Sequence, residues 1–414
     1  MGDYDDFNKK GYKMTQVQSS KLWTKDFIII SLINFFTHLV FYTLIVITAI
    51  YVVTEFNASQ SMAGLATGIF VLASLFGRIF AGKYLDRIGP KRILVGSLVL
   101  FVLAMISHLF ANTFILFLAI RFIHGIMHGS ITTSAGAISA ELIPDSRRGE
   151  GTGYYATFMN IAMAIGPFLA MFFYANFSFT AIFILGIIFA VLDLIITIFL
   201  KVPQPKGEHR AKQGFHFKDF IEPKALPISF VLFILSIPYS SLLVFLAQYA
   251  IEIDLVRAST YFFVVFAVAL IVTRPFTGVW FDRYGANRLN LPLLLLLAFG
   301  FFLLSNAKGD FSFLLSAVFI GIGFGTILSN FLAIAIQSSP PHRKGLATST
   351  FFISLDLANG IGPYINGILV AYLSFRQLYF TVGAWMLVVI GVYYLIFRKK
   401  ENNQAVNVKE QHLG

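Results

Sequence analysis

The sequence predicts an all-α membrane protein in which twelve transmembrane helices form two related six-helix bundles. Of the 414 residues, 57% are hydrophobic and only 12% are charged, which is more apolar surface than a soluble protein of this size buries. The apolar residues fall into twelve runs of about twenty residues or more, the length that a helix needs to cross a bilayer. The second half of the chain also repeats the first half at one constant offset, which predicts two copies of the same unit.

The predicted helices are divided six and six by one long polar connection. This connection, residues 201–224, carries six basic residues and is predicted to be a cytoplasmic linker. The expected organisation is an N-terminal tail (1–25), a six-helix bundle (26–200), the linker, a second six-helix bundle (225–397) and a C-terminal tail (398–414). The predicted helices cover 26–54, 61–83, 91–111, 113–140, 150–174, 178–200, 225–252, 258–281, 288–306, 311–336, 346–371 and 375–397.

The internal repeat is clearest in a charged loop after the second predicted helix. Gly82-x-x-x-Asp86-Arg87-x-Gly89-x-Lys91-Arg92 recurs as Gly278-x-x-x-Asp282-Arg283-x-Gly285-x-Asn287-Arg288, an offset of 196 residues. The same offset maps Arg78 onto Arg274, Gly125 onto Gly321, and Ile165-Gly166-Pro167 onto Ile361-Gly362-Pro363. One register across several separated clusters indicates duplication of a whole unit.

The distribution of basic residues predicts the orientation in the membrane. The two tails, the linker and the alternate loops that lie on the same side carry 25 Lys and Arg, whereas the opposite loops carry 3. Positive residues are retained in the cytoplasm, so both termini are expected to be cytoplasmic. The net charge of +11 therefore reflects topology, and no nucleic-acid partner is expected. The chain has no Cys, which excludes disulfides and thiol chemistry.

The Gly82–Arg92 pattern after a second membrane helix resembles the loop motif of the major facilitator superfamily of transporters. The first copy matches at every specified position, and the second departs from the motif at Asn287. The resemblance covers roughly residues 25–397. It implies the major facilitator fold, in which two bundles rock around a site at the midplane of the bilayer. It also implies a multi-pass plasma-membrane monomer with a small-molecule substrate, no cofactor and no metal.

The repeated loop is predicted to act as a gate. A carboxylate and a guanidinium at a helix end can pair with a neighbouring helix end and stabilise one access state. The residues predicted to contribute are Gly82, Asp86, Arg87, Gly89, Arg92, Asp282 and Arg283. The alternative is a positively charged anchor that only sets the topology.

Arg121 in the fourth predicted helix is expensive to bury in a bilayer and is therefore a candidate functional residue. His124 and His128 follow at i+3 and i+7, on the same helix face. The run resembles the Arg-x-x-x-Gly motif on helix 4 of proton-coupled members, and His titrates near neutral pH. These three residues are predicted to take part in proton coupling. The alternative for the histidines is packing in the bundle as neutral, hydrogen-bonded rings.

Asp356 lies about ten residues into the eleventh predicted helix, where a buried carboxylate pairs with a cation or holds a proton. The residue related to it by the repeat is Asn160, so the scaffold does not require an acid there. Asp356 is predicted to contribute to coupling or substrate contact, with a structural hydrogen bond as the alternative. Asp193, in the sixth predicted helix, is a weaker candidate for the same role.

A polar stripe on the first predicted helix is expected to line a substrate cavity. Asn34, His38 and Tyr42 are spaced at i, i+4 and i+8 in an otherwise apolar run. Further cavity candidates lie on the seventh and eleventh predicted helices and are Tyr239, Gln248 and Asn359. The alternative for the stripe is hydrogen bonding between helices.

Gly153, Gly166 and Pro167 on the fifth predicted helix resemble the antiporter motif of drug exporters, with several of its glycines replaced. Small residues allow close helix packing, and Pro bends a helix. The resemblance favours export, although an ordinary packing kink is the alternative.

These features together predict a proton-coupled exporter of small amphipathic or drug-like molecules that works by alternating access. The alternatives are a specific transporter of a metabolite, sugar or metallophore, working as an exporter or proton symporter, and coupling to sodium in place of protons. The sequence has no His-Glu-x-x-His, Gly-x-Ser-x-Gly or Gly-Lys-Ser/Thr motif, so a membrane enzyme is not expected.

Overall fold

The computed structural model describes residues 21–202, 221–284, 286–340 and 343–411. Within these ranges the chain is helical, with twelve α-helices and two short 3-10 turns, η1 (His108–Phe110) and η2 (Asp145–Arg147). The α-helices are α1 (Lys25–Phe56), α2 (Gln60–Ile88), α3 (Pro90–Ser107), α4 (Phe114–Leu142), α5 (Arg148–Asn176), α6 (Phe179–Ile198), α7 (Leu226–Glu252), α8 (Val256–Tyr284), α9 (Ala286–Ser305), α10 (Asp310–Gln337), α11 (Lys344–Val370) and α12 (Phe375–Gln411).

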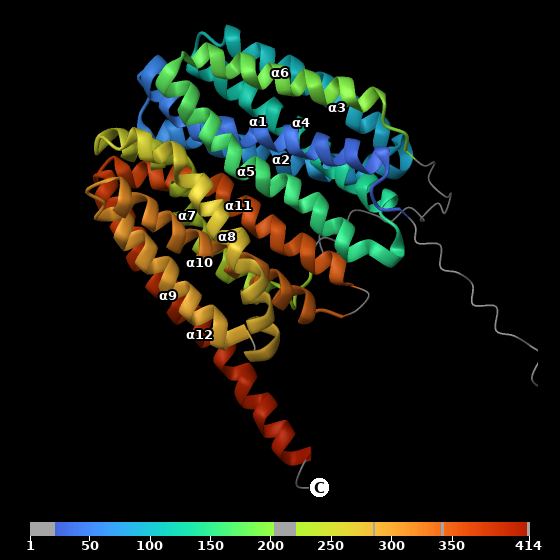
Figure 1. The fold of residues 1–414 in the computed structure, drawn as a ribbon, viewed down its shortest axis with the longest axis vertical. Coiled ribbons are helices and arrows are strands. Elements are labelled where there is room, and N and C mark those ends of the chain that lie inside the picture. Colours follow the sequence, from blue (N-terminus) through green and yellow to red (C-terminus); the bar gives the residue numbers. More distant parts are fainter. Residues whose placement is uncertain (1–20, 203–220, 285, 341–342, 412–414) are drawn as a thin grey trace, which may run out of the picture.

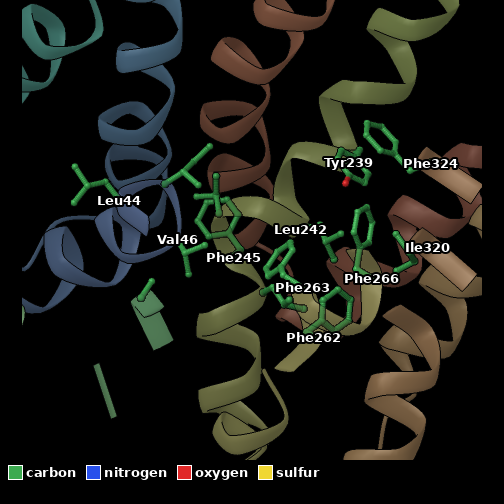
Figure 2. Packing of buried hydrophobic residues seen from close by; sticks show 14 of the residues in the cluster. Leu44, Val46, Tyr239, Leu242, Phe245, Phe262, Phe263, Phe266, Ile320 and Phe324 are labelled. Carbon is green, nitrogen blue, oxygen red and sulfur yellow. The ribbon is translucent and has the colours of Figure 1, made fainter. Parts of the chain in front are cut away.

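The helices pack as two groups that lie side by side, α1–α6 and α7–α12 (Figure 1). In the first group α1 packs against α5 and α6, and α4 against α2 and α3; in the second, α7 packs against α11 and α12, and α10 against α8 and α9. The two groups meet through α2 with α11, α5 with α8, and α1 with α7. Leu44 and Val46 of α1 and Phe245 of α7 belong to one buried apolar cluster that spans both groups (Figure 2).

Side-chain caps define where several helices begin. Thr24, Ser59, Thr113 and Ser178 each precede a helix and accept a hydrogen bond from a backbone N–H of its first turn. These bonds satisfy donors that have no partner inside the helix. Between α2 and α3 the chain turns at Gly89, whose φ of 94° is readily adopted only by glycine.

Glycines bring the helices of each group into backbone contact. A Cβ at Gly125 would lie 2.2 Å from the Phe70 carbonyl oxygen, so α4 packs closely on α2. The same contact recurs in the second group, where a Cβ at Gly321 would lie 2.5 Å from the carbonyl oxygen of Phe266. Both residues of the second contact are displaced by 196 positions from those of the first, so the sequence repeat relates packing contacts as well as motifs.

Glycines also join the two groups, at the end of the molecule away from the linker. A Cβ at Gly64 or at Gly68 of α2 would lie 2.0 Å from the carbonyl oxygens of Pro363 and Gly360 on α11, respectively. Phe168 of α5 packs against Tyr261 of α8 at the same end, with ring centroids 5.9 Å apart. The two groups are therefore tightly closed where α2 and α8 begin and α5 and α11 end.

Most of the predicted linker lies outside the described residues, but both of its ends are anchored. At its start, the Lys201 N–H donates to Asp26 Oδ1 at 2.7 Å, and Lys91 Nζ donates to the Leu200 carbonyl at 2.5 Å. At its end, the buried carboxylate of Glu222 lies 2.5 Å from Arg343 Nε, next to the start of α11. Each end of the linker is thus attached to the group of helices that it adjoins.

Two details differ from the sequence prediction. Eleven of the described helices are long and apolar enough to cross a membrane, and α11 is not among them. It carries Asp356, Asn359 and several Ser and Thr residues, and it packs between α2 and α7, so much of its surface faces protein. The second difference is the end of α12, which continues as helix to Gln411 although its apolar run stops near Phe397.

Candidate functional site

An ion pair inside the helical region links the two groups of helices. Arg78 Nε of α2 lies 3.3 Å from Asp356 Oδ2 of α11, and the two side chains are 39% and 16% exposed. Arg78 is ten residues before the end of α2, which places it about 15 Å from that end. Asp356 is twelve residues after the start of α11, which places it about 18 Å from that start. The pair is therefore deep in the membrane-spanning part of the molecule, at the boundary between the groups.

The predicted coupling residues Asp356 and Arg121 are not paired with each other; the partner of Asp356 is Arg78. Arg78, which the repeat relates to Arg274, was not predicted as a site residue. Its recurrence as Arg274 was the signal that could have drawn attention to it.

Aromatic and imidazole side chains from both groups surround the ion pair. Tyr42 of α1 lies within electrostatic range of Asp356, and Tyr239 of α7 lies within the same range of Tyr42. Arg78 interacts electrostatically with His38 and with His128. The predicted cavity residues Tyr42, His38 and Tyr239 thus lie in the region of the Arg78–Asp356 ion pair. Each group of helices supplies one residue of that pair.

His38 and His128 form a buried pair on the α1–α6 side of this site. Their ring centroids are 5.5 Å apart, and their exposed fractions are 9% and 3%. His38 Nδ1 donates to the Asn34 carbonyl at 2.8 Å, which leaves its Nε2 unprotonated when the ring is neutral. His128 packs against the rings of Phe41 and Phe70, and neither of its ring nitrogens has a hydrogen-bond partner among the described residues.

Arg121 is buried inside the first group. Its Nε donates to the Ala66 carbonyl at 3.2 Å, and its guanidinium lies 4.5 Å from the centroid of the Phe70 ring. His124, which is fully buried, packs against Phe70, Phe101 and His108. Arg121 and His124 therefore fill the space between α2, α3 and α4.

Two predicted site residues make structural hydrogen bonds within the first group. Asp193 is fully buried, and Thr37 Oγ1 donates to its Oδ2 at 2.8 Å. Asn34 is also buried, and its Nδ2 donates to the Tyr155 carbonyl at 3.0 Å. For Asn34 this contact corresponds to the alternative interpretation, hydrogen bonding between helices.

The remaining cavity candidates differ in their surroundings. Tyr239 stacks on Phe324 of α10, with ring centroids 3.5 Å apart and planes 3° from parallel (Figure 2). Gln248 is buried near the end of α7, and neither atom of its amide group bonds a described residue. Asn359 follows Asp356 by one helical turn and is half-buried, and its Oδ1 likewise has no partner among the described residues.

The predicted gating loop is only partly described. Gly89 has the left-handed backbone that the motif requires, whereas a Cβ at Gly82 would meet open space. Arg87 and Arg92 are exposed and form no ion pair with a described residue. The side chains of Asp86, Asp282 and Arg283 lie outside the described residues, so the gating role stays a prediction.

One part of the helix-5 motif borders the site. A Cβ at Gly166 would lie 2.6 Å from Tyr42 Cβ, so this glycine lets α5 approach α1 directly beside Tyr42. Pro167 follows it inside α5, and a Cβ at Gly153 would meet open space. Gly166 therefore positions Tyr42, while Gly153 makes no close contact.

The arrangement is suited to binding and proton exchange. The described residues contain no group of three or more His, Asp or Glu side chains that could hold a metal ion. A carboxylate paired with a guanidinium can be released by protonation or by a charged ligand that competes for either partner. The surrounding rings supply apolar surface with a few polar groups, the usual lining of a small-molecule site.

A sequence profile described as the Major Facilitator Superfamily matches residues 30–357 and 258–413. An uncharacterized MFS-type transporter of Methanocaldococcus jannaschii is 26% identical over 356 residues, which cover 84% of this chain and 91% of that protein. The staphylopine export protein of Staphylococcus aureus is 23% identical and covers 82% and 88% of the two chains. Multidrug resistance protein 2 of Bacillus subtilis is also 23% identical, with coverage of 84% and 89%.

Among solved structures, a mutant of the nucleoside transporter NupG superimposes with a TM-score of 0.78. The superposition covers 90% of this chain and 99% of that one, at 11% sequence identity. At this identity the likeness concerns the fold alone.

Proposed function

The chain belongs to the Major Facilitator Superfamily, and on that premise we propose that this transporter exports small amphipathic or drug-like molecules in exchange for protons. In this proposal α1–α6 and α7–α12 are pseudo-symmetric bundles that rock about the Arg78–Asp356 region. The protein acts as a monomer in the plasma membrane, with both termini in the cytoplasm. The close contacts of α2 with α11 then lie on the outer side, so this state is closed toward the outside.

The observation that carries the proposal is the ion pair between Arg78 and Asp356. When the outer side is open, α2 and α11 are apart, and Asp356 can take a proton from outside. As the outer side closes, Arg78 approaches the carboxylate and favours release of the proton toward the cytoplasm. The proton thus moves inward in each cycle, and its electrochemical gradient drives the return step that exports the substrate.

The other candidate coupling residues have secondary roles in this proposal. His38 and His128 face Arg78 and serve as the next acceptors for the proton that leaves Asp356. Arg121 and His124 support these residues from behind by packing on Phe70. Asp193 holds α6 to α1 through Thr37 and does not exchange protons.

Two relatives favour export without agreeing on the kind of substrate. The similarity to a multidrug resistance protein over most of the chain supports amphipathic compounds. The similarity to a staphylopine export protein over a comparable share of the chain supports a second candidate, a dedicated exporter of a metallophore or similar metabolite.

The test is transport of a panel of cationic, neutral and anionic amphipathic compounds into everted membrane vesicles, with proton and sodium gradients imposed separately. Asp356→Asn resembles the protonated acid and should abolish uphill transport driven by the proton gradient, while it spares downhill exchange. Asp310→Asn, an exposed carboxylate at the start of α10, is the matched control and should transport normally. If Asp356→Asn still concentrates the compound with an unchanged pH dependence, Asp356 is structural and this mechanism is wrong.

A further inference from the structure

A second arginine lies inside the membrane-spanning region without a carboxylate partner among the described residues. Arg274 of α8 is related to Arg78 by the repeat and is ten residues before the end of its helix, or about 15 Å along the axis. It is exposed and forms no ion pair with any described residue. The residue that the repeat relates to Asp356 is Asn160 of α5. The acid that pairs with Arg78 in one copy therefore has no counterpart that could pair with Arg274 in the other.

A small pocket with a mixed apolar and polar lining lies beside Arg274, between α8 and α10. Its volume is about 110 Å³, and it is lined by Leu270, Arg274, Thr277, Gly325, Thr326, Ser329 and Asn330. Three of the polar side chains that line it, Thr277, Thr326 and Asn330, are more than nine-tenths buried. Buried polar groups around a space beside a cation indicate a site for a ligand, because an apolar core has no need of them.

A buried network fixes one wall of this pocket. Asn330 Nδ2 donates to Asn290 Oδ1 at 2.8 Å, and Asn290 Nδ2 donates to the Tyr393 hydroxyl at 3.0 Å. One N–H of the Asn330 amide is thereby committed, and the second N–H has no described partner. The amide is held in place by α9 and α12, so the pocket that Arg274 lines also has a pre-positioned donor.

The chemistry of these groups selects an anion. A guanidinium supplies a planar fork of N–H donors that matches a carboxylate, and the second N–H of the Asn330 amide can add another. The hydroxyls of Thr277 and Ser329 already donate to the Arg274 and Gly325 carbonyls. An unpaired cation at this depth is costly, so an arriving anion gains more there than it would in water. A volume of about 110 Å³ holds such a group but is well below the roughly 300–1,000 Å³ of a site for a whole drug-sized molecule.

We propose that the Arg274 pocket binds a carboxylate or similarly small anionic group carried by the transported molecule. The substrate then has an anionic end at this pocket and an apolar body directed away from it. This inference rests on the proposed transport function, but it does not depend on the coupling ion or on the direction of transport.

The test measures binding without transport, on the purified full chain in lipid nanodiscs. Since the chain has no native Cys, Ser329→Cys creates a single thiol at the half-buried pocket wall, and its reaction with N-ethylmaleimide is timed. The probes are benzoate and its uncharged analogue benzamide. At about 10 mM, which saturates a site of millimolar Kd, benzoate should slow the reaction about ten-fold and benzamide should not.

Two further variants make the result specific to Arg274. Combined with Ser329→Cys, Arg274→Gln should remove the protection by benzoate, whereas Arg257→Gln, at the distant start of the same helix, should leave it intact. Equal protection by both probes, protection that survives Arg274→Gln, or no protection by benzoate would each overturn the proposal. Because no gradient is involved, failure here leaves the proton-coupled mechanism standing, and failure of the vesicle assay leaves this site standing.

Discussion

A methyl group at position 68 would separate α2 from α11 at the end of the molecule away from the linker. The ideal Cβ of an alanine there lies 2.0 Å from the Gly360 carbonyl oxygen. Ordinary carbon–oxygen contact begins near about 3.4 Å, so roughly 1.4 Å of space is missing. The obstructing atom belongs to a helical backbone and cannot rotate away, so the two helices themselves have to move apart.

This separation weakens the closed arrangement. A radial gap of about 0.5–1 Å already forfeits a quarter to a half of the dispersion attraction between facing atoms. The loss extends to neighbouring contacts of the same interface, including Gly64 with Pro363 and Gly367 with Gln60. We expect Gly68→Ala to lower the closed-to-open population ratio at this end by at least about ten-fold, which corresponds to about 1.4 kcal/mol.

Spin labels can measure this population directly. Met62→Cys on α2 and Tyr372→Cys just after α11 are exposed positions at the affected end. Pulsed electron paramagnetic resonance in nanodiscs should show a larger long-distance component in Gly68→Ala than in the parent. Gly96→Ala on α3 is the control, because its Cβ also meets open space. Identical distance distributions for Gly68→Ala and the parent would refute the claim that this close approach limits closure.

Three further predictions concern topology, the gating loop and Asp193. A membrane-impermeant thiol reagent applied outside intact cells should not label single cysteines at Lys201 or Lys344, and should label those at Ser59, Asn112 and Asn176; the reverse pattern would contradict cytoplasmic termini. Asp86→Asn should reduce transport more than Asp282→Asn, because the second motif is the less complete, and full activity in both would leave the loop with a topological role only. Thr37→Val leaves the buried Asp193 carboxylate without its donor, so it should destabilise the protein by about 1–3 kcal/mol in thermal unfolding; a changed pH profile of transport would instead assign Asp193 to coupling.

Helix positions were predictable because the hydrophobicity of each apolar run by itself favours its insertion into the bilayer. The seventh predicted helix, 225–252, corresponds to α7 at Leu226–Glu252. The predicted span 375–397 coincides with the apolar part of α12, and the helix itself continues to Gln411, because hydropathy marks where the chain leaves the membrane and not where its helix ends. In α11 polar side chains replace apolar ones where the helix packs against α2 and α7, so its composition differs from that of the other eleven spans.

Site residues were partly predictable because charges inside apolar runs are rare. Arg121 and Asp356 stood out for this reason. The residues that surround them could not be predicted, because the sequence does not show which neighbouring helix each face of a helix packs against. The structure places Arg121 against Phe70 within one group of helices and brings Arg78 to Asp356 across the boundary between groups.

Composition, hydropathy, basic-residue bias and the 196-residue repeat thus determined the class of protein, the number of helices and the division into two units. These features depend on the free energy of placing each residue in water or in lipid, and that free energy can be read from the residue type alone. The tertiary structure alone decided which charges meet, such as Arg78 with Asp356, and which have no partner in the described part of the chain, such as Arg274 beside its pocket. Those outcomes depend on the rotation and crossing of helices far apart in the chain, set by backbone contacts such as Gly68 with Gly360.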